Sequence, residues 1–218
     1  LATVQNHYWI KFLLLKTKHW KQLYLETSNQ YIDIPTSIQF LTDKSFFILS
    51  ENDGFNHIYH YDKTGKLKNQ VTKGKWEVTS YYGFDEKNKI IYYQSVENGS
   101  INRDIYSISI DGKSKKRLSL KTGTNNATFS PNFQYFINTH SSATSAPYYS
   151  LNDSKTSKEL KKIQSNELVE EKLAKYNVAP KEFSTITTEK GHVLNTWMIK
   201  PKDFDANKKY PVFMFQYS

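Results

Sequence analysis

Cysteine is missing from this sequence. The chain therefore cannot form a disulfide bond, a thiolate metal site or a cysteine nucleophile. A chain without cysteine is compatible both with the reducing cytosol and with a bacterial periplasm. This absence therefore excludes several kinds of site but leaves the compartment open.

Arginine is almost missing as well. Only Arg103 and Arg117 are arginines among the 30 basic residues, which give the chain a net charge of +9. The lysines gather in turns such as residues 62–66 and 111–116. Nucleic-acid readers tend to use arginine, because its guanidinium makes paired hydrogen bonds to phosphates and bases. We interpret the lysines as solvated turn residues and expect no nucleic-acid partner.

The sequence has no long apolar run. The longest one near the start, residues 9–15, is interrupted by Lys11 and is too short for a membrane span or a typical signal core. No membrane span or export signal is therefore expected within these residues.

Motifs for metals and cofactors are scarce too. His57 and His60 stand three apart in a predicted strand, so their side chains should point to opposite faces and should not share a metal ion. Asn52-Asp53-Gly54 offers oxygens but lacks the spacing of a calcium loop. It is more typical of a tight hairpin turn. We therefore expect neither a metal ion nor a cofactor.

Aromatic residues are abundant and follow a repeat. The chain has 16 Tyr and 13 Phe, which favour half-buried strands. Ser50, Ser95 and Ser141 each end a predicted strand and stand 45 and 46 residues apart. The repeated pattern consists of these strands and the ones that follow them, at residues 46–50, 91–95 and 135–141, then 58–62, 105–109 and 148–152. A period of 40–50 residues is typical of a β-propeller blade with four short strands. We predict a mainly β chain that begins with a partial propeller of about three blades.

The pattern changes after the third blade. Residues 165–177 have acidic residues in the first turn and lysines in the last, which predicts a short linking helix capped by Ser165 or Asn166. Two strands follow, at 182–188 and 192–200. Residues 212–217 then form a continuous apolar run, typical of a strand buried on both faces.

These patterns predict a division of the chain into three parts. Residues 1–164 should be the C-terminal part of a propeller, residues 165–180 a linking helix, and residues 181–218 the start of a second domain. The second domain should be cut short, because a strand buried on both faces belongs inside a larger sheet. The first residue, Leu1, is not a methionine, so we expect a piece of a larger protein.

Several tracts resemble one known family. They are Asn56-His57-Ile58-Tyr59, residues 72–79 and 126–133, Trp197-Met198-Ile199-Lys200-Pro201, and Lys208-Lys209-Tyr210-Pro211-Val212. From Tyr31 to Ser218 they resemble, in collinear order, the dipeptidyl peptidase IV branch of the prolyl oligopeptidase family, whereas the first thirty residues match poorly.

The resemblance implies a fold and an activity. The fold is an eight-bladed propeller joined to an α/β-hydrolase domain, and the activity is a serine peptidase that removes Xaa-Pro or Xaa-Ala dipeptides from peptides with a free N-terminus. This chain would hold the last blades and the first hydrolase strands. The resemblance also implies a bacterial, periplasmic or cell-envelope parent that forms a homodimer.

Departures from the family pattern limit the expected activity. No G-x-S-x-G nucleophile motif occurs, and the triad positions would fall beyond Ser218. The paired glutamates that hold the substrate amine would lie upstream, and Glu170-Glu171 in the linking helix is a poor substitute. The chain alone is therefore expected to be inactive.

Two site residues come from the resemblance. Tyr217 matches the tyrosine whose hydroxyl helps to form the oxyanion hole, although spacing alone fits a strand-end tyrosine at the surface equally well. Phe40 matches an aromatic residue of the outer substrate pocket. A different function also stays open, that of a non-enzymatic propeller that binds or scaffolds other proteins.

Overall fold

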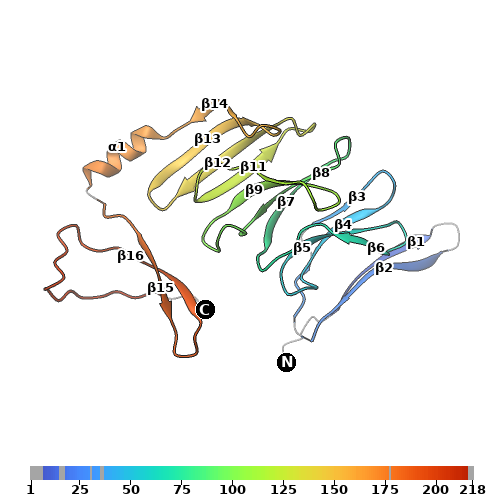
Figure 1. Cartoon of the computed structure of the whole chain (residues 1–218), viewed down its shortest axis with the longest axis horizontal. Coiled ribbons are helices and arrows are strands. Elements are labelled where there is room, and N and C mark those ends of the chain that lie inside the picture. Colours follow the sequence, from blue (N-terminus) through green and yellow to red (C-terminus); the bar gives the residue numbers. More distant parts are fainter. Residues whose placement is uncertain (1–6, 15–17, 30, 35–36, 177, 216–218) are drawn as a thin grey trace.

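The structure is a computed structural model that describes residues 7–14, 18–29, 31–34, 37–176 and 178–215. Its strands form separate antiparallel sheets that lie one after another along the chain (Figure 1). One short helix, α1, follows the last of the larger sheets. The described residues are thus mainly β, as the sequence predicts.

Three of the sheets have four strands each. Neighbouring strands in each sheet are also neighbours in sequence, in the orders β3-β4-β5-β6, β7-β8-β9-β10 and β11-β12-β13-β14. Their bounds are β3 Ile38–Phe40, β4 Phe46–Ser50, β5 His57–Tyr61, β6 Leu67–Gln70, β7 Val78–Asp85, β8 Ile90–Ser95, β9 Asp104–Ser109, β10 Lys115–Arg117, β11 Thr124–Phe129, β12 Tyr135–Ser142, β13 Ser145–Asp153 and β14 Glu159–Gln164. Four-stranded antiparallel sheets in series are propeller blades, and the predicted repeat of about three blades is confirmed.

The first two blades repeat one local arrangement. In the first blade the Thr72 hydroxyl accepts the N–H of Ile58 at 2.9 Å. In the second, the Ser119 hydroxyl accepts the N–H of Ile105 at 3.1 Å. Each hydroxyl residue stands 47 positions from its counterpart, as do the two isoleucines. In each blade the hydroxyl therefore joins the third strand to the second residue after the fourth strand.

The core lies between the blades. Phe47 and Ile58 of the first blade pack in one buried cluster with Ile91, Tyr93 and Ile108 of the second. The rings of Tyr93 and Tyr106 stack at 5.5 Å. A blade is apolar on both faces, so each one needs a neighbour to exclude water from it, which explains why aromatic residues recur with the period of the blades.

Glycines allow the close approach of successive blades. Gly112 has φ of +78°, and a Cβ there would lie 2.7 Å from the Val71 carbonyl oxygen at the end of the preceding blade. Gly65, 47 residues earlier, has φ of +89°, and a Cβ there would collide with the Leu23 carbonyl oxygen. Only glycine adopts this conformation freely and leaves that space.

The hairpin of β1 (His7–Leu14) and β2 (His19–Thr27) packs against the first blade. Leu23 and Tyr24 of β2 share a buried cluster with Phe46, Ile48 and Tyr59. Gly65 of the first blade lies against Leu23 of β2, just as Gly112 of the second blade lies against Val71 at the end of β6. The strand β2 therefore packs on the first blade in the way that the first blade packs on the second. The β1–β2 hairpin therefore continues the series of packed sheets.

Helix α1 spans Glu167–Lys175, within the predicted residues 165–177, and none of its residues is buried. The expected side-chain cap is not formed: Asn166 stands at the N-cap in a left-handed conformation and makes no capping bond. Its side-chain amide instead donates to the Pro147 carbonyl at 2.5 Å. The amide is thus used to attach the helix to the third blade.

The C-terminal residues form a hairpin and an extended segment. The hairpin consists of β15 (Glu182–Thr187) and β16 (Val193–Met198). The predicted strand at 212–217 is not formed in its described part, where Val212 to Phe215 are 77–94% exposed. Within the described residues no strand pairs with this segment, and an apolar run without a paired neighbour gains no ladder of hydrogen bonds.

Candidate functional site

A cavity of about 490 Å³ opens between β2 and the first blade. It is lined by residues 26–28, 31–34 and 49–52, with Gly54 and Asn56. These residues come from the end of β2, from the segment before β3, and from the end of β4 with the turn that follows. The cavity therefore forms where two successive structural units meet.

Glu26 is a buried carboxylate at this cavity, with 6% of its surface exposed. The Tyr24 hydroxyl donates to Glu26 Oε2 at 2.6 Å, and the Ser50 hydroxyl donates to Glu26 Oε1 at 2.8 Å. Burial, and then the bond to Glu26, raises the pKa of Tyr24. The two hydroxyls hold the carboxylate in one orientation. In the described part of the chain, no lysine or arginine forms an ion pair with it.

The cavity is negatively charged. Its described lining includes the carboxylates of Glu26, Asp33 and Glu51 and no basic side chain. Burial, and then the nearby charges of Asp33, Glu77 and Glu26, raises the pKa of Glu51. Like charges held together in this way favour a positively charged or hydrogen-bond-donating ligand. The site thus offers binding groups for such a ligand.

The turn that lines one side of the cavity is the predicted hairpin turn. Gly54 has φ of +94°, and its N–H donates to the Glu51 carbonyl at 2.8 Å. The prediction of a tight turn at Asn52-Asp53-Gly54 is confirmed. The sequence did not indicate that the same turn would line a cavity.

Of the two site residues that the resemblance predicted, Phe40 and Tyr217, the structure describes only Phe40. Phe40 lies in β3 with its side chain half exposed, and its ring packs on Phe46 at a centroid distance of 5.4 Å. It is not among the residues that line the cavity. Tyr217 lies outside the described residues. Both roles stay predictions.

The histidines of β5 have structural partners. His57 lies 3.1 Å from the Thr72 hydroxyl and 3.0 Å from the Gly74 carbonyl, and its ring packs edge-on against Trp76. His60 lies 3.1 Å from the Ser45 hydroxyl. In the described part of the chain, no group of three or more His, Asp or Glu side chains could hold a metal ion.

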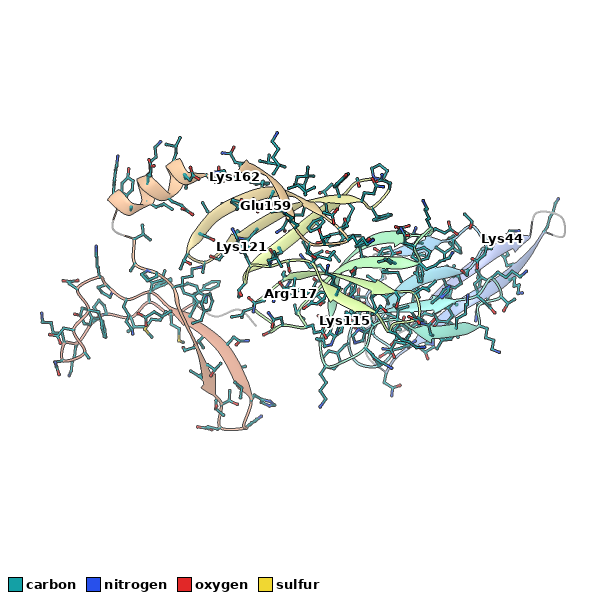
Figure 2. The ribbon with its side chains drawn as sticks, turned by 45° about the horizontal axis from the view of Figure 1, so that its top comes forward. Lys44, Lys115, Arg117, Lys121, Glu159 and Lys162 are labelled. Carbon is teal, nitrogen blue, oxygen red and sulfur yellow. The ribbon has the colours of Figure 1, made fainter. Side chains whose placement is uncertain are left out.

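The basic residues are distributed over the blades. The labelled cations of Figure 2 come from the first blade (Lys44), the second (Lys115, Arg117), the third (Lys162) and the connection between the last two (Lys121). Both arginines make internal contacts, since Arg117 pairs with the buried Asp104 at 2.8 Å and Arg103 donates to neighbouring carbonyls. Among the described residues, no helix is long and apolar enough to span a membrane.

Sequence reasoning missed Glu26, Ser50 and Glu51 as site residues. The available signal was weak, because Glu26 is one of several polar residues in its strand. Its partner Ser50 was recognised only as the end of a repeated strand. The two residues meet because β2 packs on the first blade, which no local pattern specifies.

Comparison with known proteins identifies the family. The family profile described as "Dipeptidyl peptidase IV (DPP IV) N-terminal region" matches residues 3–147. The chain belongs to the dipeptidyl peptidase IV family. It is 34% identical to dipeptidyl peptidase 4 of Trichophyton rubrum over 178 residues, which cover 80% of this chain and 23% of that protein. For the Trichophyton equinum enzyme the identity is 33% over 194 residues, covering 86% of this chain and 25% of that protein.

A solved structure of this family has the same arrangement. The crystal structure of Porphyromonas gingivalis dipeptidyl peptidase 4 matches with a TM-score of 0.88 and 38% identity, over 95% of this chain and 29% of that one. The predicted family, and the predicted fold of propeller blades, are thus confirmed. The expectation that the first thirty residues match the family poorly is wrong, because the family profile already matches from residue 3. The chain spans about a quarter of the length of these dipeptidyl peptidase IV relatives.

Proposed function

We propose that this chain is part of a serine exopeptidase that releases Xaa-Pro or Xaa-Ala dipeptides from peptides with a free N-terminus. The observation that carries the proposal is the match to dipeptidyl peptidase 4 from the first described strands to the C-terminal hairpin. In this assignment residues 1–164 belong to the propeller, 165–180 to the linking segment, and 181–218 to the start of the α/β-hydrolase domain. The coarser assignment, to a dipeptidyl peptidase, is shared with the relatives.

The cavity gives the propeller part a role in this function. Its carboxylates Glu26, Asp33 and Glu51 would attract a protonated amine or the N–H groups of a peptide. The hydroxyls of Tyr24 and Ser50 already hold the Glu26 carboxylate in one orientation. The carboxylate therefore does not need to reorient when a ligand binds. The propeller part would therefore bind the substrate, while the serine nucleophile and its acid and base partners would come from residues outside this chain.

The isolated chain tests the assignment of roles. It contains no G-x-S-x-G motif, so we expect no hydrolysis of a Gly-Pro chromogenic substrate above background. Turnover that a serine-directed phosphonate abolishes would contradict this assignment.

Tyr217 provides a second test, in the longer protein. If its hydroxyl stabilises the oxyanion, Tyr217→Phe should lower kcat by about 10²–10³-fold, since one donor to the transition state is lost. Tyr176→Phe is the matched control, because Tyr176 is 79% exposed at the end of α1. Wild-type kcat in Tyr217→Phe would show that the residue is structural.

A further inference from the structure

The loop between β8 and β9 has a well-defined internal structure. Two turns follow each other, in which Gly99 N–H donates to the Val96 carbonyl at 3.0 Å and Asn102 N–H donates to the Gly99 carbonyl at 2.9 Å. The Asn102 side-chain amide also donates to the Asn98 carbonyl at 3.0 Å. We call residues 97–102 the Ser100 loop. These bonds satisfy its backbone groups and hold it in one conformation.

Arg103 attaches this loop to the propeller. Its guanidinium NH1 donates to the carbonyls of Ser100 at 2.9 Å and Asn102 at 3.0 Å. Its backbone N–H donates to the Gly123 carbonyl at 2.9 Å. Both bonds to these carbonyls come from one nitrogen of the planar guanidinium, which fixes the directions of its two N–H groups. One of the two arginines of the chain thus holds the Ser100 loop in place where β8 and β9 of the second blade are joined.

The Ser100 loop contacts the C-terminal hairpin. The Asn195 side-chain amide donates to the Ser100 hydroxyl at 2.8 Å, and the two residues are 95 positions apart. Asn195 lies inside β16 and pairs with Thr185 of β15. The hairpin is held together beside this point by a 2.7 Å hydrogen bond between the hydroxyls of Ser184 and Thr196. Both sides of the contact are therefore ordered by their own hydrogen bonds.

The covalent connection alone would not fix the hairpin on the propeller. Helix α1, which leads to it, has no buried residue. The same arrangement of blades and hairpin nevertheless matches a solved structure over 95% of the chain with a TM-score of 0.88. A specific contact beyond the linking helix would account for this arrangement.

We propose that the Ser100 loop is the docking point that fixes the C-terminal hairpin on the propeller, with Arg103 as the positioning residue. Its consequence for catalysis rests on the proposed function: the contact would set the peptidase domain at a defined distance from the cavity at Glu26. The docking itself does not depend on peptidase activity.

Crosslinking tests the docking directly, because the chain has no native cysteine. In the full chain, Ile101→Cys with Val193→Cys leaves the Ser100–Asn195 hydrogen bond intact, because both replaced residues are exposed neighbours of that pair. This pair should give an intrachain product with a short bis-maleimide, identified by peptide mass. The matched control is Ser114→Cys with Val193→Cys. Ser114 follows the other end of β9, a strand of six residues and so about 20 Å long, which a short crosslinker cannot span. Equal yields for the two pairs, or only interchain products, would overturn the proposal.

Arg103 provides the second measurement. Adding Arg103→Ala to the Ile101 and Val193 cysteine pair should slow crosslinking by about fivefold, because loss of hydrogen bonds from a charged group frees the loop. Lys113→Ala, at the solvent-exposed turn between β9 and β10, should leave the rate unchanged. An unchanged rate in Arg103→Ala would remove Arg103 from the proposed role. If the longer protein showed no peptidase activity while crosslinking succeeded, the proposed function would fall and the docking would stand.

Discussion

The Thr72 hydroxyl offers a sharp test of how the blades are closed. Thr72 is 2% exposed, and its oxygen accepts the N–H of Ile58 at 2.9 Å and lies 3.1 Å from His57 Nδ1. Thr72→Val keeps the shape of the side chain but removes this oxygen. The N–H of Ile58, at a residue with no exposed surface, then has no acceptor.

The expected loss of stability follows from this unpaired group. A buried donor left without a partner costs about 1–3 kcal/mol, so we expect Thr72→Val to lower the free energy of unfolding by about 2 kcal/mol. With a typical dependence on urea, the midpoint of unfolding should fall by about 1 M. Trp76 fluorescence can follow the transition locally once Trp9, Trp20 and Trp197 are replaced by Phe in both variants, because the Trp76 ring packs against His57 at 4.8 Å. The measurement should be made at low protein concentration.

Thr122→Val is the matched control. Thr122 is exposed, and the same chemical change there should stay within about 0.5 kcal/mol. If the two variants unfolded at the same urea concentration, the hydroxyl of Thr72 would not close the blade, and the equivalent interpretation of Ser119 in the second blade would also be wrong.

Three further outcomes are expected. Burial lowers the pKa of His60 from 6.5 to about 4. The unfolded chain therefore takes up the proton first, and stability should fall by about 3 kcal/mol between pH 6.5 and 4, with a smaller fall in His60→Phe. Gly112→Ala should lower the melting temperature more than Gly54→Ala, because a Cβ meets the Val71 carbonyl only at Gly112. Phe213→Asp should reduce self-association in sedimentation velocity, since this side chain is 94% exposed beside other apolar groups. The first expectation would be refuted if His60→Phe and the unchanged chain had equal pH profiles of stability. The second would be refuted by equal melting temperatures of Gly112→Ala and Gly54→Ala, and the third by unchanged association of Phe213→Asp.

Local sequence patterns specify the blades. Strands that follow one another in the chain pair as hairpins, so a local alternation of apolar and turn residues specifies both the strands and their neighbours. The recurrence of Ser50, Ser95 and Ser141 therefore predicted three sheets correctly. The turn at Asn52-Asp53-Gly54 followed from the same local chemistry.

The cavity and the docking contact depend on packing between segments that are distant in the sequence. Glu26 and Ser50 come from different structural units, and Ser100 and Asn195 are 95 positions apart, so no local period connects either pair. The apolar run that begins at Val212 shows the same limit from the other side. Its residues have the composition of a buried strand, yet a strand is stabilised by the partners that pair with it, and those partners are never encoded in the strand itself.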